Sequence, residues 1–260
     1  MSLRIFKTLL VCLLVATVAL APKAVGQADN ASLEKEKAKE KQEKEKELEK
    51  EKELEKVLTQ MDNASKDFRS LEASFVWDQY TRVVDETESS KGKIYFKRDG
   101  SETNMAADIA GTPPSNAPKY VLFSGGEVKM YEIKIDKVTS YKVGKNRTEI
   151  ESFLVLGFGG RGHDLAKSYD VKYLGTEKIG DVATAKLELV PKSEKTRGKF
   201  SRILLWIDAA QGISLQQQLF QPDGDFRLAK YSEIQMNHKL PDSVFKLKTT
   251  NKTTYVSPQG

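Results

Sequence analysis

The chain has 260 residues, with 42 Lys and Arg, 37 Asp and Glu, one Cys and two His, and a formal net charge of +5. One cysteine cannot form an intramolecular disulfide, and one Cys with two His leaves too few ligands for a zinc site built from these residue types. Hydrophobic residues make up 39% of the chain, enough for a packed core. The composition therefore argues against wholesale disorder.

Residues 1–28 are predicted to be a secretory signal peptide. Arg4 and Lys7 form a short basic region, and residues 8–20 form an uncharged, largely apolar run of thirteen residues. A membrane-spanning helix needs about 20 residues, so this run fits the apolar core of a signal peptide instead, with cleavage after Ala28. An uncleaved membrane anchor is the alternative.

Cleavage would remove the only cysteine of the chain. Cys12 lies inside the apolar run after Leu10 and Val11, whereas a lipoprotein signal has a small residue before its cysteine. We therefore expect a mature chain without thiol, lipid anchor or transmembrane span, located in a bacterial periplasm as a monomer. The signal also holds three basic residues and no acid, so the net charge falls from +5 to about +2. This balance argues against nucleic acid as a partner.

Residues 29–56 form a Lys/Glu-rich spacer that is predicted to be a solvated helix or a frayed segment. Leu33 to Lys56 contains nine Lys, ten Glu and three Leu, and these are good helix formers. At a spacing of three residues eleven charge pairs are opposite and two are like, but at a spacing of four the counts are three and ten. Both spacings are neighbours on a helix, so the electrostatic support partly cancels. The leucines do not repeat in heptads, so a coiled coil is only weakly indicated. A tether or docking arm is the functional alternative.

Residues 57–260 are predicted to be the folded domain, which begins with a helix. Leu54, Val57, Leu58 and Met61 recur at helical spacing, and Phe68 and Leu71 are expected to continue that face. A second helical region is expected around residues 149–169.

The rest of this domain alternates with a period of two, which is typical of strands. Ile133 and Ile135 follow Val128 and Met130 with a one-residue shift that predicts a bulge. Glycine-containing turns are expected at residues 125–126, 175, 180–181, 212 and 222–224. The other predicted strand segments are Phe75–Trp77, Ile94–Phe96, 186–189, 202–207, 215–220, 226–228 and 234–236. Many strands with short connections predict an α+β fold with one large curved antiparallel sheet.

The sequence holds few signs of catalysis. His163 and His238 are far apart, and neither a His-Glu-x-x-His nor a Gly-x-Ser-x-Gly motif occurs. The glycine-rich residues 157–164 lack the Gly-Lys-Ser/Thr of a phosphate loop and are predicted to be a tight loop. Asp223 and Asp225 flank a turn glycine and are predicted to form the turn. We therefore expect no enzyme, no cofactor and no metal. A secreted hydrolase with an unrecognised carboxylate pair stays open as an alternative.

Five short motifs follow one another from Leu54 to the C-terminus in the order found in one family. They are Phe68–Phe75 (FRSLEASF), Gly92–Arg98 (GKIYFKR), residues 121–131 (a strand, a Gly-Gly turn and Val-Lys-Met-Tyr), Leu187–Lys192 (LELVPK) and Leu240–Phe245 (LPDSVF). In this order the chain resembles the LolA-type outer-membrane lipoprotein carriers, over roughly four fifths of its length.

The resemblance implies a half-open β-barrel that is lined with apolar side chains and closed by short helices. Such carriers bind the acyl chains of lipoproteins that an inner-membrane ATP-driven transporter releases, and they deliver this cargo to an outer-membrane acceptor. Each buried methylene contributes about 0.8 kcal/mol, so shielding acyl chains requires a dry apolar cavity. The absence of a lipoprotein cysteine favours the soluble carrier over a lipid-anchored receptor. A sensor or interaction module on the same fold, responding to lipid or stress, is the alternative.

The resemblance also implies a role for Arg98, since an arginine after this strand helps to gate the cavity in the family. Here Asp99 replaces the proline that commonly follows, and a pairing of Asp99 with Arg98 would weaken this role. A solvated Lys-Arg strand end is the alternative. Nine residues are candidates for lining the cavity: Phe75, Trp77, Ile94, Phe96, Met130, Leu205, Ile207, Phe226 and Leu228. An ordinary sheet core fits them equally well, because alternation does not say which face of the sheet is concave.

Overall fold

The computed structural model describes residues 26–100, 102–111, 117–144 and 156–258, with side chains from Glu34 onward. Most of the predicted signal peptide and residues 149–155 of the second predicted helical region lie outside the described residues. The chain divides into two compact units, residues 1–46 and 47–260. No helix among the described residues is long and apolar enough to cross a membrane.

The Lys/Glu-rich spacer is helical. Helix α1 spans Gly26–Asp67, and its side chains are exposed throughout residues 34–53. Two ion pairs, Glu40–Lys44 at 2.8 Å and Lys41–Glu45 at 3.9 Å, use the spacing of four. Exposed pairs of this kind contribute at most about 0.5 kcal/mol each.

The last turns of α1 are amphipathic and pack on the sheet. Val57 and Met61, one turn apart, are 4% and 1% exposed and join a core cluster with Leu187, Leu205 and Ile207. The helix ends at Asp67, so the expectation that it continues to Leu71 is wrong. Leu71 is buried on the first strand, because the chain changes from helical to extended geometry at Phe68.

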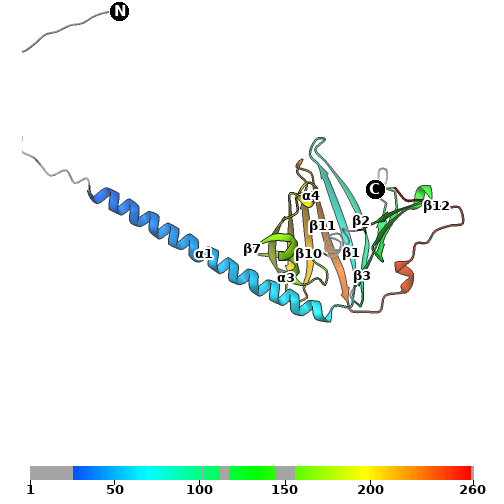
Figure 1. Ribbon diagram of the computed structural model, residues 1–260, viewed down its shortest axis with the longest axis horizontal. Coiled ribbons are helices and arrows are strands. Elements are labelled where there is room, and N and C mark those ends of the chain that lie inside the picture. The colour runs from blue at the N-terminus through cyan, green and yellow to red at the C-terminus, as the bar shows by residue number, and fades with distance from the viewer. Residues whose placement is uncertain (1–25, 101, 112–116, 145–155, 259–260) are drawn as a thin grey trace, which may run out of the picture. The chain divides into compact units, whose positions relative to one another are not determined.

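The remainder is one curved, unclosed sheet of twelve strands (Figure 1), which confirms the predicted α+β class. Neighbouring strands are antiparallel except β12 and β6, which are parallel. The strand order is β12-β6-β5-β4-β3-β2-β1-β11-β10-β9-β8-β7. The bounds are β1 Ser70–Thr81, β2 Glu86–Asp99, β3 Glu102–Ala110, β4 Lys119–Ser124, β5 Glu127–Glu132, β6 Lys137–Lys142, β7 Tyr169–Ile179, β8 Val182–Pro191, β9 Arg202–Asp208, β10 Ile213–Phe220, β11 Phe226–Met236 and β12 Thr254–Val256.

The helices outside α1 in the described residues are short. They are α3 Gly162–Ser168, α4 Glu194–Arg197 and the 3-10 helices η1 Ile133–Ile135 and η3 Asp242–Phe245. The predicted bulge at Ile133 and Ile135 is thus a 3-10 turn between two strands, and Asp136 ends it with a φ of 46°. Ile133 and Ile135 are 44% and 58% exposed. They therefore lack the side-chain packing that favours β-branched residues in strands.

The two segments predicted at residues 226–228 and 234–236 belong to the single strand β11. Between them Glu233 has a φ of 51°, and the pairing with β1 shifts between Glu72 and Ser74. This bulge inserts a residue into β11 and hides the continuity of the strand in its sequence. Gly175, predicted as a turn, lies inside β7 at a similar register shift, with a φ of 125°.

The pairing register defines the two faces of the sheet, because paired residues on antiparallel strands point to the same side. One row of paired residues is Leu71, Phe96, Met105, Phe123 and Val128, and the next is Ala73, Ile94, Ala107, Val121 and Met130. All of these residues except Met130 belong to the main core cluster or pack against it. We call the side that carries them the inner face and the opposite side the outer face.

Candidate functional site

The central rows of the inner face of strands β1 to β5 are apolar. Phe75, Phe96 and Phe123 are each at most 1% exposed. The Phe75 ring lies against Trp77 with 4.6 Å between centroids, which extends the apolar surface toward the β1–β2 hairpin. Gly92 leaves room for it, since a Cβ at Gly92 would come within 2.9 Å of the Phe75 ring.

Residues 156–161, which we call the glycine loop, cover this face. Phe158 packs on side chains from β2 and β11, the two strands that flank β1. Its ring stacks on Phe96 with 4.8 Å between centroids and forms a T-shaped contact with Tyr231, also at 4.8 Å. Gly159 adopts a φ of 68°, and a Cβ there would come within 2.4 Å of the Phe68 ring. Only glycine combines this backbone angle with this approach, so the loop composition follows from its packing.

The glycine loop is fastened to the sheet by backbone contacts. The Ser214 N–H donates to the Gly157 carbonyl at 2.7 Å, and the Gln217 side-chain amide donates to the Leu156 carbonyl at 2.6 Å. Tyr231 donates to the Gln217 Oε1 at 3.3 Å, which orients that amide. Burial raises the pKa of the Tyr231 phenol, so it remains a donor.

Arg98 joins the glycine loop to α1. Its two terminal nitrogens donate to the carbonyls of Ser65 at 2.6 Å and Gly159 at 2.5 Å, and the guanidinium lies 5.3 Å from the Phe68 ring centroid. Burial, together with the nearby Arg69 charge, lowers the pKa of Arg98. Asp99 is exposed and pairs in register with Glu102, and within the described residues it forms no ion pair with Arg98. Arg98 is thus hydrogen-bonded to both the loop and the helix, and its gating role stays a prediction.

A second clasp holds the other end of the loop to α1. His163 contacts Asp62 with its Nδ1 at 2.8 Å and Glu55 with its Nε2 at 3.1 Å, and its backbone N–H donates to Asp62 at 3.2 Å. The hydrogen bond to Asp62, aided by Glu55, raises the pKa of His163. Burial disfavours the Asp62 carboxylate, but hydrogen bonds from His163 and Arg161 outweigh it and lower the pKa of Asp62.

The structure brings together only part of the predicted lining. Phe75, Ile94 and Phe96 lie in the inner-face core, Trp77 packs against it, and Met130 is half-buried in the same row as Ile94. Leu205 and Ile207 are on the same side but belong to the core beneath α1.

Phe226 and Leu228 lie on the outer face, so the prediction that all nine residues share one surface is wrong. They pair with Tyr80 and Asp78, which alternate with the inner-face residue Trp77. The Phe226 ring stacks on Tyr80 at 4.9 Å. Apolar and polar side chains do alternate along β11, but only its pairing with β1 determines which of them share a face with Trp77.

Phe158, Tyr231 and Gln217 belong to the candidate site, although the sequence pattern does not single them out. In the sequence, Phe158 is a single aromatic residue between Gly157 and Gly159, and this segment is predicted only as a tight loop. The two rings that Phe158 contacts, Phe96 and Tyr231, are 62 and 73 residues away along the chain, so no local pattern links them.

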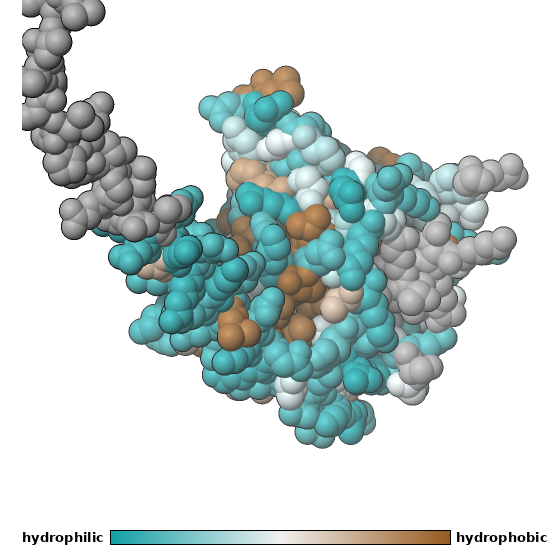
Figure 2. Space-filling model, turned by 60° about the vertical axis from the view of Figure 1, so that its left-hand side comes forward, coloured by the Kyte–Doolittle hydropathy of each residue, from teal (hydrophilic) through white to brown (hydrophobic). Residues whose placement is uncertain are grey.

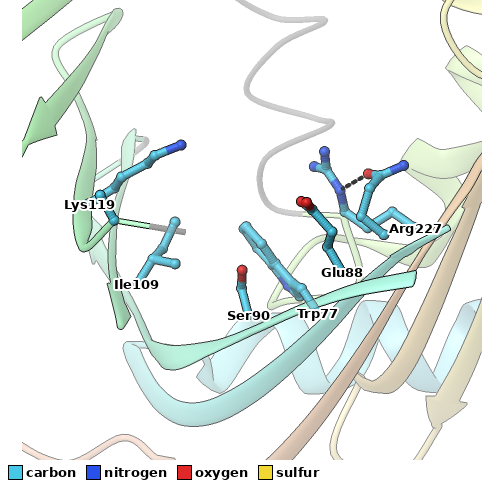
Figure 3. A pocket seen from close by; sticks show the side chains of 8 residues that line it. Trp77, Glu88, Ser90, Ile109, Lys119 and Arg227 are labelled. Atoms are coloured by element: carbon cyan, nitrogen blue, oxygen red, sulfur yellow. Dashed lines mark hydrogen bonds between the residues drawn. The ribbon is translucent and has the colours of Figure 1, made fainter. Parts of the chain in front are cut away.

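A small cavity opens on the inner face near the β1–β2 hairpin (Figure 3). Its volume is about 200 Å³. Its lining is Trp77, Gln79, Glu88, Ser90, Ile109, Ala117, Lys119 and Arg227. A space-filling view shows apolar atoms in the middle of one face of the molecule, framed by polar side chains (Figure 2). Among the described residues no three His, Cys, Asp or Glu side chains gather as metal ligands would.

Among the described residues, one curved and unclosed sheet has its apolar inner face covered by a loop, as in a half-barrel. Residues 66–248 match the family of the outer membrane lipoprotein carrier protein LolA, and the chain belongs to this family. Proteins with this fold are binding or carrier proteins of lipids or lipoproteins.

Solved structures resemble the chain in fold at low sequence identity. An uncharacterised conserved protein from Thermus thermophilus is 11% identical with a TM-score of 0.51, covering 78% of this chain and 98% of that one. MucB, in its complex with MucA from Pseudomonas aeruginosa, is 13% identical with a TM-score of 0.46, covering 75% and 61%. A LolA superfamily protein from Nitrosomonas europaea is 14% identical with a TM-score of 0.38, covering 74% and 97%. Curated protein sequences give no match.

Proposed function

We propose that this protein is a soluble periplasmic carrier that binds acyl chains of lipoproteins or related lipids on the inner face. The observation that carries the proposal is the Phe158 ring, which occupies the apolar surface of Phe96 and Tyr231 from a loop and not from a strand or long helix. Phe158 is only 2% exposed and belongs to the core cluster of the inner face. A side chain delivered by a loop can be withdrawn without breaking the sheet.

An acyl chain would replace Phe158 and its neighbours in the glycine loop. The exchange is close to neutral for the protein core, because one apolar group leaves the inner face as another arrives. The cargo gains about 0.8 kcal/mol for each methylene that leaves water. Binding is therefore driven by the length of chain that is shielded.

Arg98 acts in this proposal as the latch of the closed form. Its two hydrogen bonds to Ser65 and Gly159 hold the glycine loop on the sheet and would have to break for the loop to lift. Hydrogen bonds from a charged donor contribute about 1.5–3 kcal/mol. Hydrogen bonds of this free energy would stabilise the closed state, and the free energy of binding an acyl chain could still open it.

The carrier would act as a monomer between two membranes. It would accept cargo from an inner-membrane ATP-driven transporter and release it to an outer-membrane acceptor. The family assignment and the predicted signal peptide support this route.

Mass spectrometry of material that copurifies with the protein from a native envelope tests the proposal. We expect acylated lipoprotein or lipid in the wild type and less of it in a variant that fills the loop site, Phe158→Trp. An inner face that stays closed, and that takes up no fluorescent acyl probe even after Arg98→Leu, would contradict the proposal.

A further inference from the structure

The small cavity beside Trp77 combines an apolar floor with two cationic side chains. Trp77 and Ile109 form part of the floor, and Lys119 and Arg227 approach from opposite sides (Figure 3). Ile109 pairs with Lys119 across β3 and β4, and Trp77 contacts Phe75 of the inner-face core. The cavity is thus continuous with the apolar face on which acyl chains are proposed to lie.

Arg227 is held in a fixed orientation. Its Nε donates to the Gln79 Oε1 at 3.1 Å, and its guanidinium lies 5.5 Å from the Trp77 ring centroid. The Gln79 amide is itself oriented, because its Nε2 donates to the carbonyls of Tyr80 and Phe226 at 3.3 and 3.4 Å. Within the described residues, the terminal nitrogens of Arg227 have no hydrogen-bond acceptor.

Neither cation has a carboxylate partner in the described part of the chain. Arg227 is exposed, yet partial desolvation by the surrounding protein atoms lowers its pKa. An arginine side chain remains charged in proteins at neutral pH. Glu88 is the one acid in the lining, and it is exposed and outside ion-pair distance of both cations. The lining therefore carries one positive charge in excess.

The geometry points to a subsite at Arg227 and Lys119 for the anionic headgroup, a carboxylate or phosphate, of an amphiphile whose chain runs over Trp77 toward Phe75. A planar guanidinium fits two oxygens of such a group, and a lysine supplies a second charge. The volume of about 200 Å³ is below the roughly 300 Å³ at which drug-sized ligand sites begin. It therefore suits a headgroup and not an acyl chain. This inference rests on the proposed acyl-chain binding and adds the charge of the cargo to it.

Titration of the full chain with dodecyl probes of different headgroup tests the inference. The probes are dodecyl phosphate, dodecanoate, dodecyl maltoside and dodecyltrimethylammonium, with inorganic phosphate alone as the chain-free anion. We expect the two anionic probes to bind about tenfold more tightly than the maltoside, the effect of one charge-assisted hydrogen bond. Inorganic phosphate should bind far more weakly than dodecyl phosphate, because it gains nothing from the apolar floor.

Arg227→Gln should abolish most of the anionic preference while leaving the affinity for dodecyl maltoside unchanged. Arg202→Gln is a matched control, since Arg202 also lies over an aromatic ring, Phe220 at 4.2 Å, but on the outer face. Circular dichroism and thermal unfolding confirm that both variants fold.

The outcomes separate the two proposals. Binding of the maltoside without any preference for anions overturns the subsite and leaves the carrier function standing. Equal affinity for inorganic phosphate and dodecyl phosphate also overturns it, because the site would then serve a free anion. Failure of every dodecyl probe, neutral ones included, contradicts the carrier function itself.

Discussion

Arg98 donates a hydrogen bond of 2.5 Å to the carbonyl oxygen of Gly159, a residue 61 positions further along the chain. The same guanidinium donates to Ser65 on α1, so one side chain joins the strand β2, the first helix and the glycine loop. The loop that this contact holds carries Phe158 into the inner-face core.

Replacing Arg98 with Leu should loosen the glycine loop. Two backbone carbonyls lose a charged donor, so we expect the free energy of unfolding to fall by about 2 kcal/mol. Hydrogen exchange at residues 156–161 should also become faster. Urea unfolding and amide-exchange mass spectrometry measure both effects. Asp99→Asn is the control: since Asp99 is exposed, it should change stability by less than about 0.5 kcal/mol. An equal effect of both substitutions would revive the pairing of Asp99 with Arg98.

Phe158→Ala should create an apolar site that a ligand can fill. Truncating a buried phenylalanine costs about 3–5 kcal/mol, and Phe158 is 2% exposed. An acyl probe should restore part of this loss, because ligand binding to the folded state raises its stability. Thermal unfolding with and without dodecyl maltoside measures the rescue. A rescue no larger than in the wild type would count against displacement of Phe158 by cargo.

Gly159→Ala tests whether close packing or backbone angle dictates the glycine. An added Cβ would lie 2.4 Å from the Phe68 ring, whereas at Gly100, with a similar φ of 58°, it would meet nothing within 4 Å. Gly100→Ala thus carries only the cost of the left-handed conformation, roughly 1 kcal/mol. We expect Gly159→Ala to be clearly more destabilising, by urea unfolding. Equal costs would show that Phe68 moves aside freely.

The His163 clasp should make stability depend on pH. The folded-state pKa of His163 is raised by its carboxylate partners. The clasp therefore contributes fully below the unfolded value of about 6.5, and its contribution is lost as pH rises through the higher folded value. Because the ring is partly exposed, we expect a loss of at most about 1 kcal/mol. Urea unfolding from pH 6 to pH 8.5 should show this decline in the wild type and not in His163→Gln. A decline of the same size in the variant would assign it to other groups.

Glu88→Gln should strengthen binding of anionic amphiphiles, if Arg227 and Lys119 form the headgroup subsite. Removing the one acid in the lining takes away a repulsive charge, and we expect a few-fold lower dissociation constant for dodecyl phosphate. Asp170→Asn, an exposed acid on the edge strand β7, is the control and should have no effect. Unchanged binding in Glu88→Gln would indicate that the anion lies away from this cavity.

The sequence by itself determined the elements that depend on neighbours along the chain. The period-two pattern of Phe75 and Trp77, of Ile94 and Phe96, and of residues 202–207 predicted strands that form. The Lys/Glu composition predicted the exposed helix, and the ordered motifs predicted the family. Local patterns failed where a bulge interrupts them, as at Glu233 in β11, or where a strand has small residues in place of alternating large ones, as in Met105-Ala-Ala-Asp of β3.

Only the tertiary structure decided which residues meet. Phe226 and Trp77 both alternate with polar neighbours, yet they point to opposite faces, because β1 and β11 pair Trp77 with Ala229 across more than 150 residues of chain. The partners of Phe158, the acceptors of Arg98 and the cavity shared by Lys119 and Arg227 are long-range in the same way. Alternation is a property of one strand, whereas the face it exposes is set by its register with another. The sequence therefore determined that apolar faces exist, and the pairing of distant strands determined which of them covers the site.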